Sequence, residues 1–128
     1  MNSLSKENTK LGFIGIGHMG SRIAKRLLDH GYQVIAYNRS REAAEALVKN
    51  GATVAASIAE LASAADVILS SLTNDDAVKS VYTDPQGVFA HLRRGSAIIE
   101  MSTVLPVTSR ELSELSRQAG VKFLDSPV

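Results

Sequence analysis

Residues Leu11–Gly20 read LGFIGIGHMG, a short apolar run that ends in Gly-x-Gly-x-x-Gly and leads at once into an amphipathic helix pattern. In such a turn Gly15 permits the tight change from strand to helix, and Gly17 lets the backbone approach a pyrophosphate. Gly20 lets the helix lie close to the strand. The helix N-terminus then offers unpaired N–H groups and a partial positive charge to phosphates. Glycine clusters also form ordinary loops, but the position of this one between strand and helix predicts a dinucleotide-binding turn.

The composition is typical of a soluble globular domain. Of the 128 residues, 45% are hydrophobic and 21% are charged, and the formal net charge is +1. So small a net charge gives no electrostatic reason to expect a nucleic-acid partner or an acidic membrane surface. The sequence has no cysteine, which excludes disulfides, thiol catalysis and cysteine–zinc sites. No histidines and carboxylates share ligand spacing, so we expect no metal.

Residues 1–9 form a polar leader that lacks the apolar core of a signal peptide. No apolar run approaches the roughly 18–20 residues that a membrane-spanning helix requires. We therefore expect a cytoplasmic protein without a membrane partner.

Strand-like and helix-like segments alternate along the rest of the chain. The predicted strands are Lys10–Gly15, Gln33–Tyr37, Thr53–Ala55, Asp66–Leu72, Ser96–Met101 and Lys122–Asp125. Helices are predicted from the glycine turn to His30, over Arg41–Asn50, from Ser57 to Ser63, from Asn74 to Tyr82 and over Pro106–Ala119, with a turn at Asp84–Gly87. This alternation predicts an α/β fold, a Rossmann-type doubly wound parallel sheet in a single domain over residues 10–128. The chain stops directly after the sixth strand, so we expect one whole cofactor domain.

Residues at the helix ends support these boundaries. Gly31, Gly51 and Gly120 stand where a left-handed residue closes a helix. Ser57 and Glu60 have the three-residue spacing of a capping box.

Several acidic side chains could be mistaken for catalytic groups. Asp75 and Asp76 look like paired carboxylates, but their place at the start of a helix explains them. Asp66 and Asp125 flank strands, and we interpret both as structural.

The nucleotide is predicted from the end of the second strand, where an Asp or Glu would bind the adenosine ribose and repel a 2′-phosphate. The sequence has Asn38, Arg39 and Ser40 instead. The Arg39 guanidinium can grip a phosphate and stack on adenine, and the Ser40 hydroxyl can donate to the same phosphate. The alternative is a solvated surface arginine beside a helix N-cap serine. Because this segment follows a predicted dinucleotide-binding turn, Asn38, Arg39 and Ser40 favour NADP over NAD as the cofactor.

With these segments in place, the chain resembles the β-hydroxyacid dehydrogenase family, which includes 3-hydroxyisobutyrate dehydrogenase and is related to 6-phosphogluconate dehydrogenase. The motifs that carry the resemblance are Gly12–Gly20, Gly31-Tyr32-x-Val34, Asn38–Ser40, Ala65–Ile68, Glu100–Thr103, Ser109–Leu112 and Phe123–Val128. They run in order from Lys10 to Val128.

The resemblance implies a role for each cofactor-binding position. The turn holds the pyrophosphate, the segment after the second strand holds the 2′-phosphate, and residues beyond the fourth and fifth strands line the nicotinamide side. The implied residues are Gly15, Ile16, Gly17, His18, Met19, Gly20, Asn38, Arg39, Ser40, Leu72, Thr73 and Thr103. Alternatives stay open at two of them, because His18 can simply face solvent and Thr103, with Ser102, can form a turn before a helix. Thr73 stands where the family commonly has proline.

The resemblance also implies parts that this sequence lacks. In the family a Ser-Gly-Gly turn follows the Asp-Ser-Pro-Val motif, and a later helical domain carries a catalytic lysine and much of a dimer interface. No lysine here matches that position, so no catalytic residue is assigned. The implied activity is hydride transfer between NADP(H) and a small β-hydroxyacid or semialdehyde, with a small-molecule substrate only if a second domain is supplied.

Two other functions remain open at this stage. One is a non-catalytic NADP-binding module, and the other is the cofactor domain of an imine reductase, which shares the glycine turn and an Asn-Arg-Ser/Thr segment. A doubly wound domain that binds no dinucleotide is a third, less specific possibility. Without the helical domain, apolar surface near the sixth strand would be exposed, so a homo-oligomer is possible.

Overall fold

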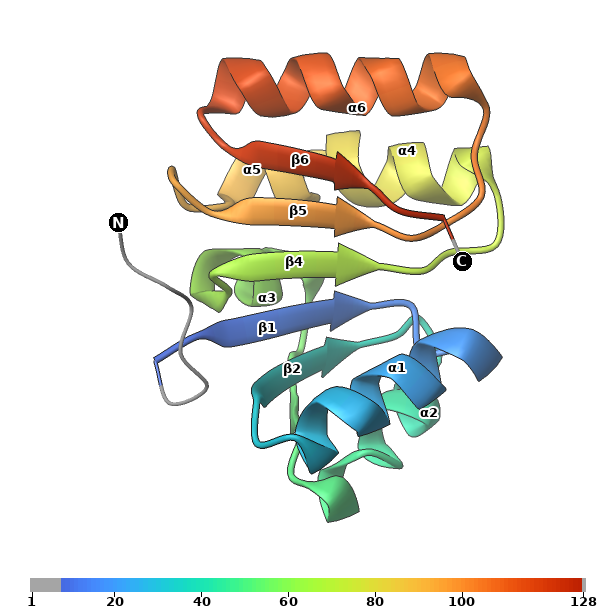
Figure 1. The fold of residues 1–128 in the computed structure, drawn as a ribbon, viewed down its shortest axis with the longest axis vertical. Helices are drawn as coiled ribbons and strands as arrows, with labels where there is room; N and C mark the ends of the chain where they lie inside the picture. The colour runs from blue at the N-terminus through green and yellow to red at the C-terminus, as the bar shows by residue number, and fades with distance from the viewer. Residues whose placement is uncertain (1–7, 128) are drawn as a thin grey trace.

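A computed structural model describes residues 8–127, which form one six-stranded, entirely parallel sheet (Figure 1). The strands are β1 (Lys10–Ile14), β2 (Gln33–Tyr37), β3 (Thr53–Val54), β4 (Val67–Ser70), β5 (Ala97–Glu100) and β6 (Lys122–Asp125). Their order in the sheet is β3-β2-β1-β4-β5-β6. This is the doubly wound arrangement, in which successive strands are added on one side of β1 and then, from β4 onward, on its other side. The predicted fold class is therefore confirmed.

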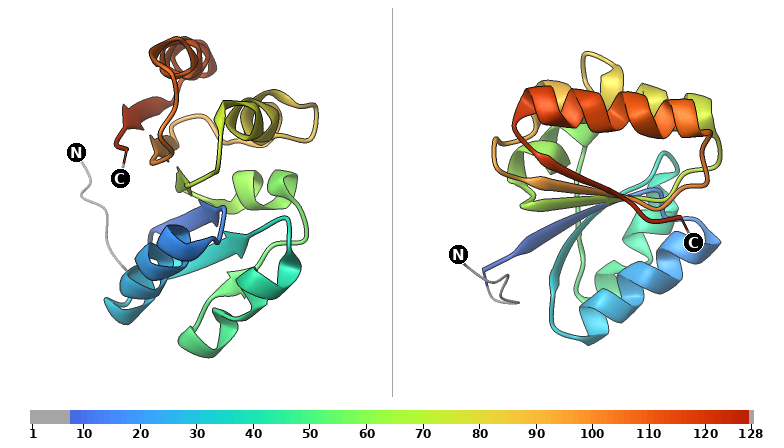
Figure 2. Two further views of the ribbon diagram at one scale, coloured as in Figure 1. Left: turned by 90° about the vertical axis from the view of Figure 1, so that its right-hand side faces the viewer. Right: turned by 45° about the horizontal axis from the view of Figure 1, so that its top comes forward.

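Helices cover the sheet on both faces (Figure 2). They are α1 (His18–Asp29), α2 (Arg41–Glu45), α3 (Ile58–Ala64), α4 (Asp75–Thr83), α5 (Val88–His91) and α6 (Pro106–Ala119), with a short 3₁₀ turn η1 (Val48–Asn50) after α2. The four central strands β1, β2, β4 and β5 contribute to two apolar cores, since successive side chains point to opposite faces. Phe13 packs with α1 and α2, whereas Ile14 packs with α3–α6.

The predicted helix ends are confirmed where local chemistry determines them. Gly31, Gly51 and Gly120 all have positive φ. The Ser57 hydroxyl accepts from the Glu60 amide at 3.0 Å, and the Glu60 carboxylate accepts from the amide of Ala56 at 2.7 Å. The capping box at the start of α3 is thus present.

One predicted helical boundary is wrong, and one short helix was not predicted. The helix predicted over Arg41–Asn50 ends at Glu45, and a tighter 3₁₀ turn follows, because the buried Leu47 side chain is drawn into the core. The four-residue helix α5 was not predicted, since residues after Gly87 are too few to show a period of 3.6. Val88 at its start is completely buried.

No helix among residues 8–127 is long and apolar enough to cross a membrane.

Candidate functional site

The carboxyl ends of four adjacent strands lie at one edge of the sheet. Ile14 pairs with Tyr37 of β2 and with Ser70 of β4, and Ser70 pairs with Glu100 of β5. The loops that follow these strands therefore begin side by side, at the right-hand ends of the arrows in Figure 1. This edge, on either side of the point where the strand order reverses, is where doubly wound sheets bind their ligands.

The glycine turn has the backbone that a close approach of strand and helix requires. Gly15 has φ of +94°, a conformation that side chains disfavour. A Cβ atom at Gly20 would lie 2.2 Å from the Gly15 carbonyl oxygen, so only glycine lets α1 lie this close to the turn. A Cβ atom at Gly17, by contrast, would meet nothing within 4 Å. The space around this position is therefore open, and Gly17 directly precedes α1, whose first N–H groups have no acceptor within the helix.

His18 and Met19 form the exposed first turn of α1, and Met19 is 47% exposed. Their amides belong to the helix N-terminus, and their side chains are free to face solvent or a bound group. Both readings of His18 from the sequence therefore remain open.

Ile16 has a structural role that the sequence did not indicate. Its side chain lies in the core with α1, and its amide donates to the Asn38 side-chain oxygen at 2.8 Å. The same Asn38 side chain donates to the Ser40 carbonyl at 2.9 Å. Asn38 therefore joins the glycine turn to the loop after β2, and we interpret it as a residue that positions this loop.

Arg39 and Ser40 are both exposed at the end of β2. None of the ion pairs among the described residues includes Arg39. Ser40 occupies the residue before α2, but its side chain makes no capping hydrogen bond. The hydroxyl and the guanidinium therefore stand beside the glycine turn with their hydrogen-bond donors accessible, as binding of a 2′-phosphate would require.

Leu72, Thr73 and Thr103 lie in the two loops on the other side of the turn. Leu72 is half-buried, and its amide donates to the Ser102 hydroxyl at 2.6 Å. Thr73 and Thr103 are exposed. The structure thus brings all the predicted positions to the same edge of the sheet.

A buried polar cluster beneath these loops was not predicted. The Ser70 hydroxyl donates to the Glu100 carboxylate at 2.5 Å, and the Tyr82 hydroxyl lies 2.6 Å from the same serine oxygen. The Ser102 amide donates to the other carboxylate oxygen at 2.7 Å. Burial raises the pKa of Glu100 against the lowering effect of these hydrogen bonds, and burial also raises the pKa of Tyr82. One sequence signal could have indicated this cluster: Ser70 and Glu100 are polar residues that each end an apolar strand, and they pair in the sheet.

Asp75 makes a second connection between the loops. Its carboxylate accepts from the Leu105 amide at 2.9 Å and from the Thr108 hydroxyl at 2.6 Å, so the start of α4 is held against the start of α6. The hydrogen bond from Thr108 is the main cause of the lowered pKa of Asp75. Helix initiation alone, the reading from the sequence, was therefore incomplete. Asp66 and Asp125 are structural as predicted, because they accept from the Lys10 amide and the Ser109 hydroxyl.

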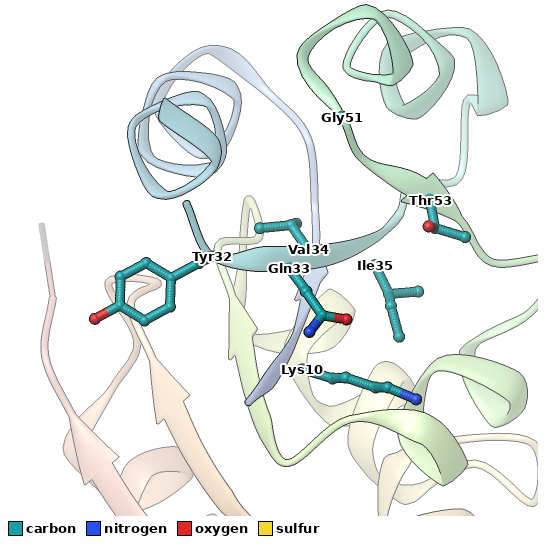
Figure 3. A pocket seen from close by; sticks show the side chains of 7 residues that line it. All are labelled: Lys10, Tyr32, Gln33, Val34, Ile35, Gly51 and Thr53. Carbon is teal, nitrogen blue, oxygen red and sulfur yellow. The ribbon is translucent and has the colours of Figure 1, made fainter. Parts of the chain in front are cut away.

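A hollow of about 430 Å³ lies elsewhere, and Figure 3 shows its lining. It is bounded by residues at the amino-terminal part of β1 and β2 and beside β3: Lys10, Tyr32, Gln33, Val34, Ile35, Gly51 and Thr53. This is the edge of the sheet opposite the glycine turn. The described residues contain no group of three His, Asp or Glu side chains that could hold a metal ion.

The sequence and the fold both match known proteins. Residues 10–128 match the family described as the NAD binding domain of 6-phosphogluconate dehydrogenase. The chain is 35% identical over 119 residues to the NAD-dependent L-serine dehydrogenase of Pseudomonas aeruginosa, which covers 93% of this chain and 40% of that relative.

Two solved structures are similar over most of this chain. The 3-hydroxyisobutyrate dehydrogenase of Mycobacterium tuberculosis with L-serine has a TM-score of 0.87 at 31% identity, covering 94% of this chain and 40% of that one. The imine reductase of Myxococcus stipitatus in complex with NADP⁺ has a TM-score of 0.82 at 30% identity, covering 91% of this chain and 39% of that one. The chain thus spans about 40% of the length of these three proteins.

These matches confirm the resemblance drawn from the motifs. The glycine turn and the strand order that carry the likeness lie within the matched range. The chain belongs to the family of NAD-binding domains of the 6-phosphogluconate dehydrogenase type, and it is an NAD(P)-binding domain like those of 3-hydroxyisobutyrate dehydrogenase-like oxidoreductases.

Proposed function

We propose that this domain binds NADP(H) in preference to NAD(H) and forms the cofactor half of an oxidoreductase acting on a small β-hydroxyacid or semialdehyde. The observation that carries the proposal is the open space above Gly17 beside an accessible Arg39, at a strand end without a carboxylate. A carboxylate at that strand end would repel a 2′-phosphate, whereas a guanidinium attracts it.

The chain's own residues have binding and orienting roles in this proposal. The amides at the start of α1 face the pyrophosphate, and Arg39 with Ser40 faces the adenosine 2′-phosphate. Leu72 and Thr103, in the loops on the other side of the turn, would hold the nicotinamide half. Once bound, the cofactor supplies the hydride chemistry at its nicotinamide ring.

Substrate binding and proton transfer are proposed to come from a further helical domain. The Ser-Gly-Gly turn and the lysine that the family resemblance implies are matched by none of the 128 residues. The substrate class follows from the 3-hydroxyisobutyrate dehydrogenase similarity and is part of the proposal. The imine reductase similarity favours a second candidate, reduction of a C=N bond on the same cofactor.

The preference for NADP(H) can be tested by calorimetric titration of the purified chain with NADPH and with NADH. A charge-assisted hydrogen-bonded contact contributes roughly 1.5–3 kcal/mol, so we expect NADPH to bind about 10- to 100-fold more tightly. Arg39→Ala should remove the preference and leave NADH binding nearly unchanged.

Arg26→Ala is the matched control, because Arg26 is an exposed arginine in the last turn of α1. It should preserve the preference. Equal binding of the two cofactors by the wild-type chain would contradict the NADP assignment. A preference that survives Arg39→Ala would contradict the role of Arg39.

A further inference from the structure

The two loops on the nicotinamide side of the candidate site are joined through a single buried side chain. Glu100 ends β5 and is fully buried, with 0% of its surface exposed. One carboxylate oxygen accepts from the Ser70 hydroxyl at the end of β4, and the other accepts from the Ser102 amide in the loop after β5. The Ser102 hydroxyl in turn accepts from the Leu72 amide in the loop after β4. A continuous series of hydrogen bonds therefore connects the loop after β4 to the loop after β5.

The directions of these hydrogen bonds match an ionised carboxylate. The Ser70 hydroxyl has one proton, which it donates to Glu100, so the Tyr82 hydroxyl of α4 is the donor to Ser70. Among residues 8–127, the two groups that hydrogen-bond to the Glu100 carboxylate, the Ser70 hydroxyl and the Ser102 amide, both donate to it.

The fold alone does not explain a carboxylate at this position. None of the ion pairs among residues 8–127 includes Glu100, and the negative charge of Asp125 at the end of β6 adds to burial in raising its pKa. A buried carboxylate without a cationic partner costs stability, and an apolar side chain in its place is often neutral or stabilising. The contribution of Glu100 has to be sought in what it holds in place.

We propose that Glu100 is a positioning residue that sets the spacing of the two loops so that Leu72 and Thr103 can bind the nicotinamide half of the dinucleotide. The proposal rests on the proposed function, because that function assigns these loops to the nicotinamide. It requires that Glu100 affect the nicotinamide half and leave the adenosine half, which lies at the end of β2, unaffected.

The test compares two ligands with each variant of the 128-residue chain. NADPH spans both halves of the site, whereas adenosine 2′,5′-bisphosphate reaches only the adenosine half. Glu100→Leu removes the carboxylate that accepts from the Ser70 hydroxyl and the Ser102 amide. We expect it to weaken NADPH binding by tenfold or more and to change binding of the bisphosphate by less than about twofold.

Glu100→Gln should restore most of the lost affinity. Its amide oxygen can accept from the Ser102 amide while its nitrogen donates to the Ser70 oxygen, so both loops stay joined without the charge. Asp125→Asn is the matched control, because Asp125 is the exposed register partner of Glu100 and accepts from Ser109. It should leave both affinities unchanged.

A second variant guards against misfolding of Glu100→Leu. Ser102→Ala removes the acceptor of the Leu72 amide without introducing a bulky side chain, and it should reproduce the selective loss of NADPH affinity. Equal weakening of both ligands by these variants, or no weakening of NADPH, would overturn the positioning role.

Amide hydrogen exchange separates this proposal from the proposed function. Exchange at Leu72 and Ser102 should accelerate in Glu100→Leu and recover in Glu100→Gln, without any ligand present. Unchanged exchange would overturn the positioning role even if NADPH binds well. Failure of the wild-type chain to bind NADPH, with exchange responding as expected, would overturn the proposed function and the nicotinamide assignment while leaving the loop connection supported.

Discussion

Adding one methyl group at Gly20 and one at Gly17 should have opposite consequences. At Gly20 the new Cβ atom would lie 2.2 Å from the Gly15 carbonyl oxygen, and Cβ atoms essentially never approach closer than 3.0 Å. The start of α1 would have to move away from the turn by at least about 0.8 Å, and its neighbour is backbone rather than a flexible side chain. At Gly17, which has φ of −89°, the new Cβ atom would meet nothing within 4 Å.

The free energies of unfolding should separate the two variants. Overpacking typically costs about 1–3 kcal/mol, and a clash with backbone belongs at the upper end or beyond, so we expect Gly20→Ala to lose about 2–4 kcal/mol. For a domain of this size that corresponds to roughly 10 °C in Tm. Gly17→Ala should stay within about 1 kcal/mol of the wild type, since its backbone conformation suits alanine.

Cofactor affinity should identify Gly17→Ala as the variant that loses binding while it keeps its stability. The methyl group of Gly17→Ala would occupy the space where the pyrophosphate is expected, so NADPH affinity should fall at least tenfold in a protein that remains folded. Urea unfolding followed by circular dichroism and calorimetric titration provide both measurements. Gly17→Ala that binds NADPH like the wild type, or Gly20→Ala that is as stable as the wild type, would refute the account of this turn.

Three further predictions concern charge and exposed apolar surface. Burial raises the pKa of Glu100 above its unfolded value, so the wild type should lose stability relative to Glu100→Gln as pH rises above about 4.3; parallel urea midpoints from pH 4 to 7 would contradict this. The pKa of Asp75 is lowered, so the stability it contributes should be lost as pH falls below the ordinary value of 3.8, and Asp75→Asn should flatten that decline in acid unfolding curves. Leu124 is 57% exposed on β6, and Phe123 beside it packs into the opposite core. Sedimentation should therefore show concentration-dependent association that Leu124→Glu weakens, whereas a wild-type monomer at high concentration would count against this interface.

The sequence predicts the parts of this fold that local chemistry determines. Gly15 and Gly20 have a backbone conformation and a close contact that only glycine allows, so the position of the glycine turn places β1 and α1. Gly31, Gly51 and Gly120 end their helices for the same local reason. The alternation of strands and helices, with right-handed crossovers between parallel strands, then predicts a parallel doubly wound sheet, but it leaves the order of the strands open.

The parts that were not predicted depend on contacts between distant segments. Asn38 holds the amide of Ile16, 22 residues away, and Ser70 meets Glu100 across 30 residues. Asp75 fits its role as a helix-initiating residue completely, so nothing local indicates its bonds to Leu105 and Thr108. Such pairs become visible only when the register of β1, β4 and β5 is known.

The most direct test of the central claim is a titration of the isotope-labelled chain with NADP⁺, followed by backbone amide NMR. The account predicts saturable shifts at Gly17, His18 and Met19, together with Arg39, because these lie where the pyrophosphate and the 2′-phosphate are expected. Shifts confined to Lys10 and Gln33 at the opposite edge of the sheet, or no shifts at millimolar NADP⁺, would contradict it.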